Sequence, residues 1–182
     1  MTVYCDMTSE PGAAWTLIES FSLKNKGLKQ FNKHPLQINV PVNEMSPNWN
    51  LYRMGLSQMT HLKSQASHWR VTCSFPDHGV DYTDYVRAKF ADFDIMTFTG
   101  SGVCKHVEYV NIRGHQCVQC NAKWWHDVGP HFDSSAGGCQ FVATTGALSS
   151  EDNFGLYSVV NNKFRCSSTT SSTTNWWFGG YL

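Results

Sequence analysis

The chain has 182 residues and a formal net charge of zero, because its 14 Lys and Arg residues balance its 14 Asp and Glu residues. Without a strongly basic window to displace counterions from phosphates, nucleic acid is excluded as a partner. No apolar run approaches the roughly 18 residues of a membrane-spanning helix, which excludes membrane insertion. A charged fraction of 15% together with 14% aromatic residues is typical of extracellular, β-rich recognition modules.

Seven cysteines in a chain of this length indicate disulfide bonds and an oxidising, extracellular compartment. We expect Cys5 to be unpaired, its partner having preceded Met1 in a longer secreted protein from which this domain is excised. The others are sufficient for three bridges, and the sequence leaves their pairing open. These disulfide candidates are Cys73, Cys104, Cys117, Cys120, Cys139 and Cys166.

Residues 1–50 predict two strands followed by a surface excursion. The strands lie within residues 3–23, on either side of a turn marked by Pro11 and Gly12. Residues 24–50 are polar, contain Pro35, Pro41 and Pro47, and show no clear period, so we expect them to cover the surface.

Residues 51–113 predict a helix and a central sheet. Apolar side chains recur at helical spacing over 57–66. Residues 68–75 alternate between apolar and polar side chains, which predicts a half-buried strand with His68 and Arg70 on its polar face. Further strands are predicted over 80–87, 89–98 and 105–113.

Regular periodicity fades beyond Gly114, so residues 114–182 are predicted to form a loop-rich, disulfide-tied region that carries the ligand site. The Ser/Thr run at 167–174 predicts a mobile loop, and residues 175–178 a short closing strand. The whole chain, 1–182, is predicted to be one α+β domain with a twisted, mostly antiparallel sheet and one or two short helices.

Two stretches of the chain carry a resemblance to a known family. They are residues 3–7 (Val-Tyr-Cys-Asp-Met) with Gly12 and residues 15–17 (Trp-Thr-Leu), and residues 56–62 (Leu-Ser-Gln-Met-Thr-His-Leu) running into 69–71 (Trp-Arg-Val). The chain thereby resembles the fibrinogen C-terminal-like domain, in its opening strands and in the helix before a central strand. The related C-propeptide of fibrillar collagens shares the opening and a similar helix, and related domains occur in secreted matrix proteins of invertebrates such as corals.

The resemblance implies an extracellular protein that binds glycans, acetylated groups or protein partners in adhesion, innate recognition or matrix, rather than an enzyme. It also implies calcium, which this family holds in a loop before a cysteine. The comparable residues here, 131–139, contain a single acidic side chain where the family carries an Asp-x-Asp pair.

Oxygen-bearing side chains in two turns are the candidate calcium ligands. Calcium prefers several oxygen ligands, and two such loops brought together would supply them. The same residue types also form ordinary turns, so that alternative stays open. The candidates are Asp133, Ser135, Glu151 and Asp152.

A second metal hypothesis rests on Cys117, Cys120, His126 and His131, whose spacing approximates a zinc knuckle. Zinc or copper held there would make the protein a metal enzyme. In an oxidising compartment the same cysteines would instead tie a small loop, so zinc is a weaker expectation than calcium.

Adjacent pairs of tryptophans are the candidates for ligand contact. Neighbours in a strand point to opposite faces, so one indole of each pair is expected outside. An exposed indole suits the apolar face of a sugar ring or an acetyl methyl group. With two nearby histidines, the predicted ligand-binding residues are Trp124, Trp125, His126, His131, Trp176 and Trp177.

The sequence therefore predicts a secreted, lectin-like recognition domain whose partner is a glycan or an extracellular protein. One alternative is a structural matrix or oligomerisation domain that binds no small ligand and would assemble as a homo-oligomer. The other alternative is the metal enzyme over residues 117–131. No catalytic residue is predicted, because no nucleophile elbow, paired catalytic carboxylates or helical His-Glu-x-x-His motif is present.

Overall fold

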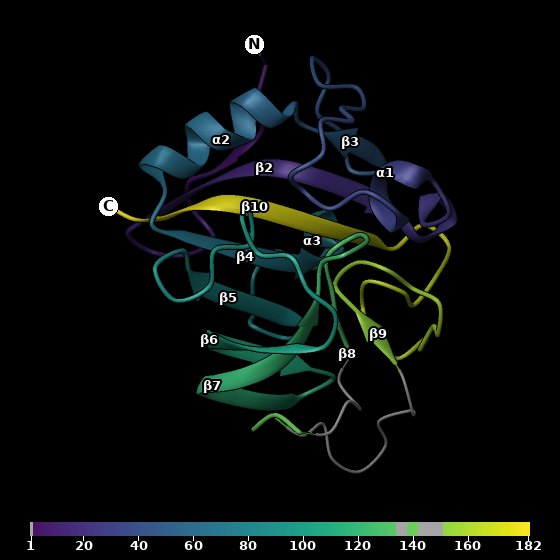
Figure 1. Ribbon diagram of the computed structural model, residues 1–182. Helices are drawn as coiled ribbons and strands as arrows, with labels where there is room; N and C mark the ends of the chain where they lie inside the picture. Colours follow the sequence, from purple (N-terminus) through teal and green to yellow (C-terminus); the bar gives the residue numbers. More distant parts are fainter. Residues whose placement is uncertain (1, 134–137, 142–150) are drawn as a thin grey trace.

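In the part of the chain that the structure describes, one large antiparallel β-sheet is accompanied by three short helices (Figure 1). The computed structural model describes residues 2–133, 138–141 and 151–182. All strand pairs within these ranges are antiparallel. The predicted fold class, a sheet-dominated α+β protein tied by disulfides, is confirmed.

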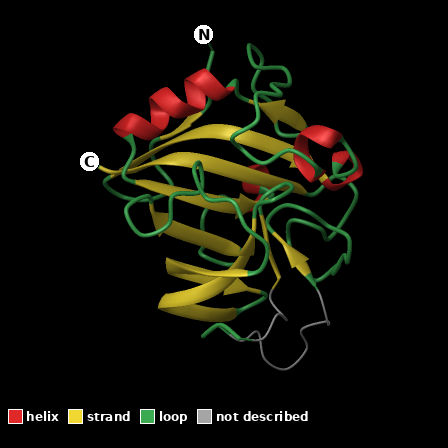
Figure 2. Cartoon of the chain, viewed as in Figure 1, coloured by secondary structure: helices red, strands yellow, loops and turns green. Residues whose placement is uncertain are grey.

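The bounds of the elements follow, and Figure 2 shows that strands and loops make up most of the described chain. The strands are β1 (Cys5–Asp6), β2 (Ala13–Ser22), β3 (Leu51–Arg53), β4 (His68–Cys73), β5 (Tyr85–Lys89), β6 (Val103–Ile112), β7 (His115–Trp125), β8 (His131–Asp133), β9 (Asp152–Asn153) and β10 (Thr173–Tyr181). The helices are α1 (Lys29–Asn32), α2 (Leu56–Gln65) and α3 (Phe75–His78), with a 3-10 turn, η1, at Leu23–Asn25.

The C-terminal strand β10 lies inside the sheet, between β2 and β4. The strand order is β1-β2-β10-β4-β5-β6-β7-β8-β9, and β3 pairs with β2 outside this path. In Figure 1 the yellow β10 runs between the purple β2 and the teal β4. The strand predicted over 175–178 therefore exists, but it is longer and central, and it joins the N-terminal strands to the rest of the sheet.

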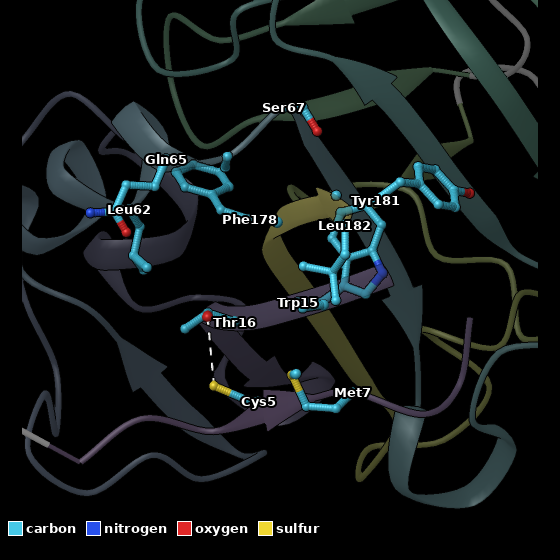
Figure 3. Close-up of a pocket in the computed structure, with 14 residues that line it drawn as sticks. Cys5, Met7, Trp15, Thr16, Leu62, Gln65, Ser67, Phe178, Tyr181 and Leu182 are labelled. Carbon is cyan, nitrogen blue, oxygen red and sulfur yellow. Dashed lines mark hydrogen bonds between the residues drawn. The ribbon is translucent and has the colours of Figure 1, made fainter. Parts of the chain in front are cut away.

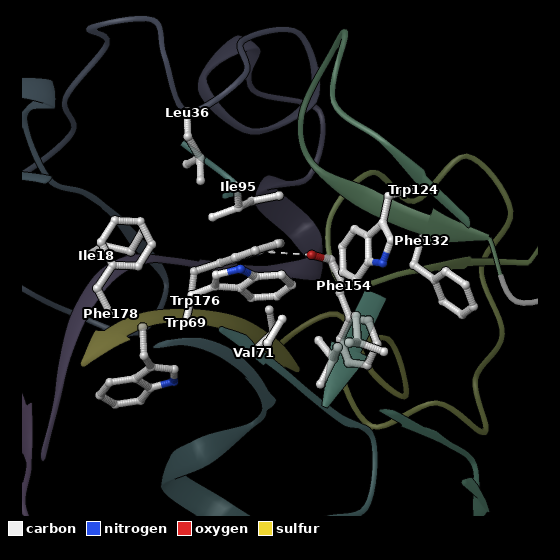
Figure 4. Packing of buried hydrophobic residues seen from close by; sticks show 14 of the residues in the cluster. Ile18, Leu36, Trp69, Val71, Ile95, Trp124, Phe132, Phe154, Trp176 and Phe178 are labelled. Carbon is white, nitrogen blue, oxygen red and sulfur yellow. Dashed lines mark hydrogen bonds between the residues drawn. The ribbon is translucent and has the colours of Figure 1, made fainter. Parts of the chain in front are cut away.

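Tryptophans from three strands form the centre of the hydrophobic core (Figure 4). The rings of Trp69 and Trp176 stack with centroids 5.5 Å apart, and Trp124 meets Trp69 edge-on at 5.5 Å. The indole N–H of Trp69 donates to the Phe93 carbonyl, and that of Trp176 donates to the Phe154 carbonyl. Each of these two indoles thus buries its apolar surface while its N–H group keeps a hydrogen-bond partner.

Periodicity correctly predicted the positions of a helix and of four strands, although β4, expected to be half-buried, is buried on both faces. The helix expected over 57–66 is α2, whose N-cap is Gly55. The strands expected over 68–75 and 105–113 are β4 and β6. The two strands expected within residues 3–23 are β1 and β2.

The strand predicted over 89–98 is wrong, because β5 ends at Lys89 and residues 90–98 form turns and irregular segments. The Asp94 carboxylate accepts a hydrogen bond from the Met96 N–H, and Phe93 N–H bonds the Lys89 carbonyl. Phe93, Ile95 and Met96 are all buried, so the apolar side chains enter the core from turns and not from one face of a strand.

Two expectations about the C-terminal half also need correction. Residues 115–125 form the long strand β7 rather than a loop. Gln119, at a φ of 49°, interrupts the alternation of side chains between the two faces of this strand, so the sequence lacks the regular period that would have predicted it. The end of the run predicted as a mobile loop belongs to β10, where Thr173 and Thr174 are buried and paired with β2.

Three disulfides tie the fold together. They join Cys73 to Cys166, Cys104 to Cys139 and Cys117 to Cys120. Cys5 is free and exposed. The prediction of three bridges among six cysteines, with Cys5 unpaired, is confirmed.

We expect removal of Cys73–Cys166, by a double substitution to alanine, to lower the free energy of unfolding most, by about 4 kcal/mol. It spans 93 residues, against 35 for Cys104–Cys139 and 3 for Cys117–Cys120, so its loss frees the most unfolded-chain entropy. Urea unfolding of the three double variants measures this order, with Cys5→Ala as the control. A larger loss from the 117–120 pair would contradict it.

Candidate functional site

A cleft of about 240 Å³ lies where the end of β10 meets the C-terminal end of α2 and the N-terminal strands (Figure 3). Thr16, Gln65 and Ser67 supply neutral polar groups to its lining, and Leu62 and Phe178 supply apolar surface. None of the described residues that line it has a charged side chain. The cleft is therefore suited to a neutral ligand with both polar and apolar groups.

Two consecutive glycines of β10 shape this cleft. A Cβ on Gly179 would lie 2.0 Å from the Ala14 carbonyl oxygen, so only glycine lets β10 approach β2 here. Gly180 has a φ of 142°, and a Cβ there would lie 2.1 Å from Ser67 Oγ. The pair thus leaves room for the hydroxyl of Ser67 at the cleft wall.

The Ser67 hydroxyl begins a chain of hydrogen-bonded polar groups behind the cleft. Ser67 is exposed, and its Oγ lies 2.8 Å from Nδ1 of the buried His68. His68 Nε2 lies 3.3 Å from Oε2 of Glu108 on β6. A hydroxyl, an imidazole and a carboxylate therefore contact one another in succession, and the hydroxyl belongs to a residue that lines the cleft.

Two cations from β5 hold the Glu108 carboxylate. Arg87 Nε donates to Oε2 at 2.9 Å, and Lys89 Nζ lies 3.6 Å from Oε1. Burial alone would raise the pKa of Glu108, but the hydrogen bond and charge of Arg87 bring that pKa below its usual value. The carboxylate is therefore anionic at neutral pH.

The same chain continues across the sheet as a buried ionic network. Arg87 donates to Glu10 at 3.0 Å, and Glu10 also accepts from Arg70. The Arg70 guanidinium is bonded to Asp6 at 2.6 Å and lies between the rings of Trp15 and Trp177, 4.6 and 4.9 Å from their centroids. The β1–β2 hairpin is thereby fixed over the polar face of β4 that the sequence predicted.

Three of the predicted ligand-binding tryptophans lie in the core. Trp124, Trp176 and Trp177 have 0% of their surface exposed, since both faces of the central strands are covered. This corrects the expectation that one residue of each pair points outward. Trp125 is partly exposed and stacks on His131, with ring centroids 5.5 Å apart.

His126 is a buried structural histidine. Its Nε2 accepts the Leu36 N–H at 2.9 Å, and its Nδ1 lies 2.9 Å from the Phe98 carbonyl, so both ring nitrogens are engaged. Cys117 and Cys120 are joined to each other. Among the described residues no group of three or more Cys, His, Asp or Glu side chains is placed to hold a metal, and the zinc or copper hypothesis over 117–131 stays a prediction.

The structure brings two of the candidate calcium ligands face to face. Asp133 on β8 is the register partner of Asp152 on β9, and burial together with the charge of Asp133 raises the pKa of Asp152. Glu151 instead accepts two hydrogen bonds from Arg113. Ser135 lies outside the described residues, and calcium stays a prediction.

Comparison with known proteins gives no match to a family model, to a curated protein or to a solved structure. The resemblance to the fibrinogen C-terminal-like domain therefore stays a prediction. Within the described ranges, no helix has both the length and the apolar character needed to cross a membrane.

Sequence reasoning missed the residues of the cleft. Gln65 and Ser67 carry no motif, and Thr16 is singled out only by the family resemblance of residues 15–17. The three residues meet because β10 enters the sheet beside β2. The polar face of the strand at 68–75 was the one available signal, since it placed His68 beside Arg70. The acidic partners of His68 and Arg70 lie far from them in the sequence.

The buried His126 predicts a loss of stability in acid. Burial lowers its pKa from 6.5 to about 4, so between these pH values the unfolded chain binds a proton that the folded protein does not. Stability from this residue is complete above pH 6.5 and falls by about 3 kcal/mol as pH drops to about 4. The measurement is urea unfolding of wild type and His126→Asn across this range, where the difference between them should shrink in acid. Parallel curves would show that His126 is not the group responsible.

A bound cation would relieve repulsion between Asp133 and Asp152, so we expect calcium to raise the thermal midpoint above its value in a chelator. Asp133→Asn should reduce that difference. Differential scanning fluorimetry measures both effects, and identical midpoints with calcium and chelator would end the calcium prediction.

Proposed function

We propose that this protein is an extracellular recognition domain that binds a small neutral group, such as one glycan residue or an acetylated amine, in the cleft beside β10. The observation that carries the proposal is the lining of the cleft, which combines neutral hydrogen-bonding groups with apolar surface. The three disulfides support an oxidising, extracellular setting.

The chemistry of the lining fits the two sides of a sugar ring. Hydroxyl and amide groups of Thr16, Ser67 and Gln65 both donate and accept hydrogen bonds, as ring hydroxyls require. Leu62 and Phe178 offer surface to C–H groups or an acetyl methyl. At about 240 Å³ the cleft is smaller than most sites for drug-sized ligands, so it suits a single ring or acyl group.

An aromatic side chain at the rim supports recognition of such a ligand. Tyr181 is 47% exposed, and its ring is held by the Arg87 guanidinium at 5.2 Å and by His68 edge-on at 5.5 Å. A ring fixed in this way presents a face to a ligand with little loss of rotamer freedom on binding.

The alternative of a structural or oligomerising domain has one observation in its favour. Exposed apolar residues, Met7 and Leu182, adjoin the free Cys5 at the same cleft. A disulfide-linked dimer through Cys5, seen by non-reducing electrophoresis and absent in Cys5→Ser, would favour this alternative over a small ligand.

Filling the cleft should weaken binding. We expect Gln65→Trp to weaken binding of the preferred sugar at least tenfold, because the indole occupies space that the ligand needs. Ser64→Trp is the matched control, since Ser64 is the neighbouring exposed residue of α2 and does not line the cleft. The measurement is a ligand-observed NMR titration with methyl glycosides of neutral hexoses and of N-acetylhexosamines. Equal affinity in the two variants, or no binding by wild type, would overturn the proposal.

A further inference from the structure

We propose that Ser67 is a nucleophile and His68 its general base, so that the cleft also carries out acyl transfer from small neutral esters. This inference rests on the proposed function, since it assigns a reaction to the same cleft. It goes beyond recognition because binding alone requires neither an imidazole behind the hydroxyl nor a carboxylate behind the imidazole.

The backbone holds the Ser67 hydroxyl at the cleft wall. Ser67 N–H donates to the Gly179 carbonyl at 3.0 Å, and its own carbonyl accepts from Phe90 N–H at 3.0 Å. Figure 3 shows Ser67 between Gln65 and Tyr181. Because Gly180 has no side chain to cover it, the hydroxyl is both fixed and accessible to a ligand.

The imidazole of His68 is oriented for proton transfer. Its Nδ1 lies 2.8 Å from Ser67 Oγ, and its Nε2 lies 3.3 Å from Glu108. Because Glu108 is an acceptor, the proton of neutral His68 belongs on Nε2, which leaves Nδ1 free to accept the Ser67 proton. The two nitrogens exchange the roles they have in the familiar serine-protease triad, and either nitrogen of imidazole can act as the base.

Glu108 acts through His68 and is a positioning residue. Its negative charge favours the imidazolium that forms when Ser67 loses its proton. Arg87 and Lys89 hold the carboxylate in place from β5. The acidic side chain is 12% exposed, so its field at His68 is only partly screened by water.

The proposed reaction has two stages, acylation and then deacylation of Ser67. Ser67 Oγ attacks the ester carbonyl carbon while its proton passes to His68 Nδ1; the C–O bond to the alcohol then breaks, and the alcohol leaves with that proton. Water next attacks the acyl-Ser67 carbonyl and gives a proton to His68, and Ser67 leaves by taking that proton as the carboxylic acid is released. The substrate class is a small neutral ester, such as an O-acetylated sugar, because the lining residues carry no charged side chain.

The direct test is covalent labelling with diisopropyl fluorophosphate, which forms an O–P bond to an activated serine and releases fluoride. We expect one adduct per chain, mapped to Ser67 by peptide mass spectrometry and lost in Ser67→Ala. His68→Asn should slow labelling at least about 100-fold, the usual contribution of a general base. Ser64→Ala is the matched control and should label like wild type, because the Ser64 hydroxyl donates to the His61 carbonyl and not to an imidazole nitrogen.

Turnover is tested with p-nitrophenyl acetate in a Cys5→Ser background, because the Cys5 thiol in the same cleft would itself accept the acetyl group. Glu108→Gln should slow turnover at least tenfold, and Glu108→Asp, which keeps the charge, should recover part of the rate. Equal rates for Gln and Asp variants of unchanged thermal midpoint would remove Glu108 from the mechanism.

Absence of an adduct on Ser67, or labelling of His68→Asn at the wild-type rate, would overturn the inference. Since Ser67→Ala changes only an exposed hydroxyl, the test does not depend on a variant with an altered core. The two proposals can be told apart by their outcomes. If the protein binds sugar but Ser67 is not labelled, only the proposal of acyl transfer is overturned. If Ser67 is labelled but no sugar binds, the proposed ligand class is overturned and the assignment of Ser67 as a nucleophile is retained.

Discussion

The insertion of β10 between β2 and β4 is the constraint on which the rest of the structure depends. Backbone hydrogen bonds from one strand satisfy the edges of two others, so strands from both ends of the chain form one sheet. The Cys73–Cys166 disulfide links β4 to the segment that leads into β10, and Gly179 permits its close approach to β2 at the other end. Without this strand the walls of the cleft would not meet.

A buried charge network secures the register of that insertion. Burying Arg70 costs desolvation energy, which is offset only if Asp6, Glu10 and the flanking indoles are all in place. A shift of β4 by one residue would turn the Arg70 side chain to the opposite face, away from Asp6 and Glu10. The polar face of β4 therefore specifies one pairing, and the same specification sets His68 beside Ser67.

The sequence predicted those elements whose environment is visible in a single local period. Helix α2 and strands β4 and β6 each show an apolar period in the sequence, and their boundaries were close, although β4 is buried on both faces rather than one. The tryptophan pairs failed because the rule for neighbours assumes that one face of the strand meets solvent, whereas β10 is covered on both, so Trp176 and Trp177 are buried alike. The cleft was out of reach for another reason: Ser67 and His68 are adjacent in the chain, but Glu108 and Gly180 reach them only through pairing between distant strands.

The cleft and the ionic network behind it require opposite electrostatic environments, and the sheet keeps the two environments apart. A neutral ligand favours a wall without charged side chains, since charges facing the cleft would have to lose water to admit it. Activation of a hydroxyl, by contrast, needs a nearby anion to stabilise the imidazolium. The structure satisfies both by placing Glu108 one imidazole away from the Ser67 hydroxyl and pairing it with Arg87. His68 is the only described residue that contacts both Ser67 and Glu108 by side-chain hydrogen bond or ion pair, so the proposed acyl transfer depends on that single ring.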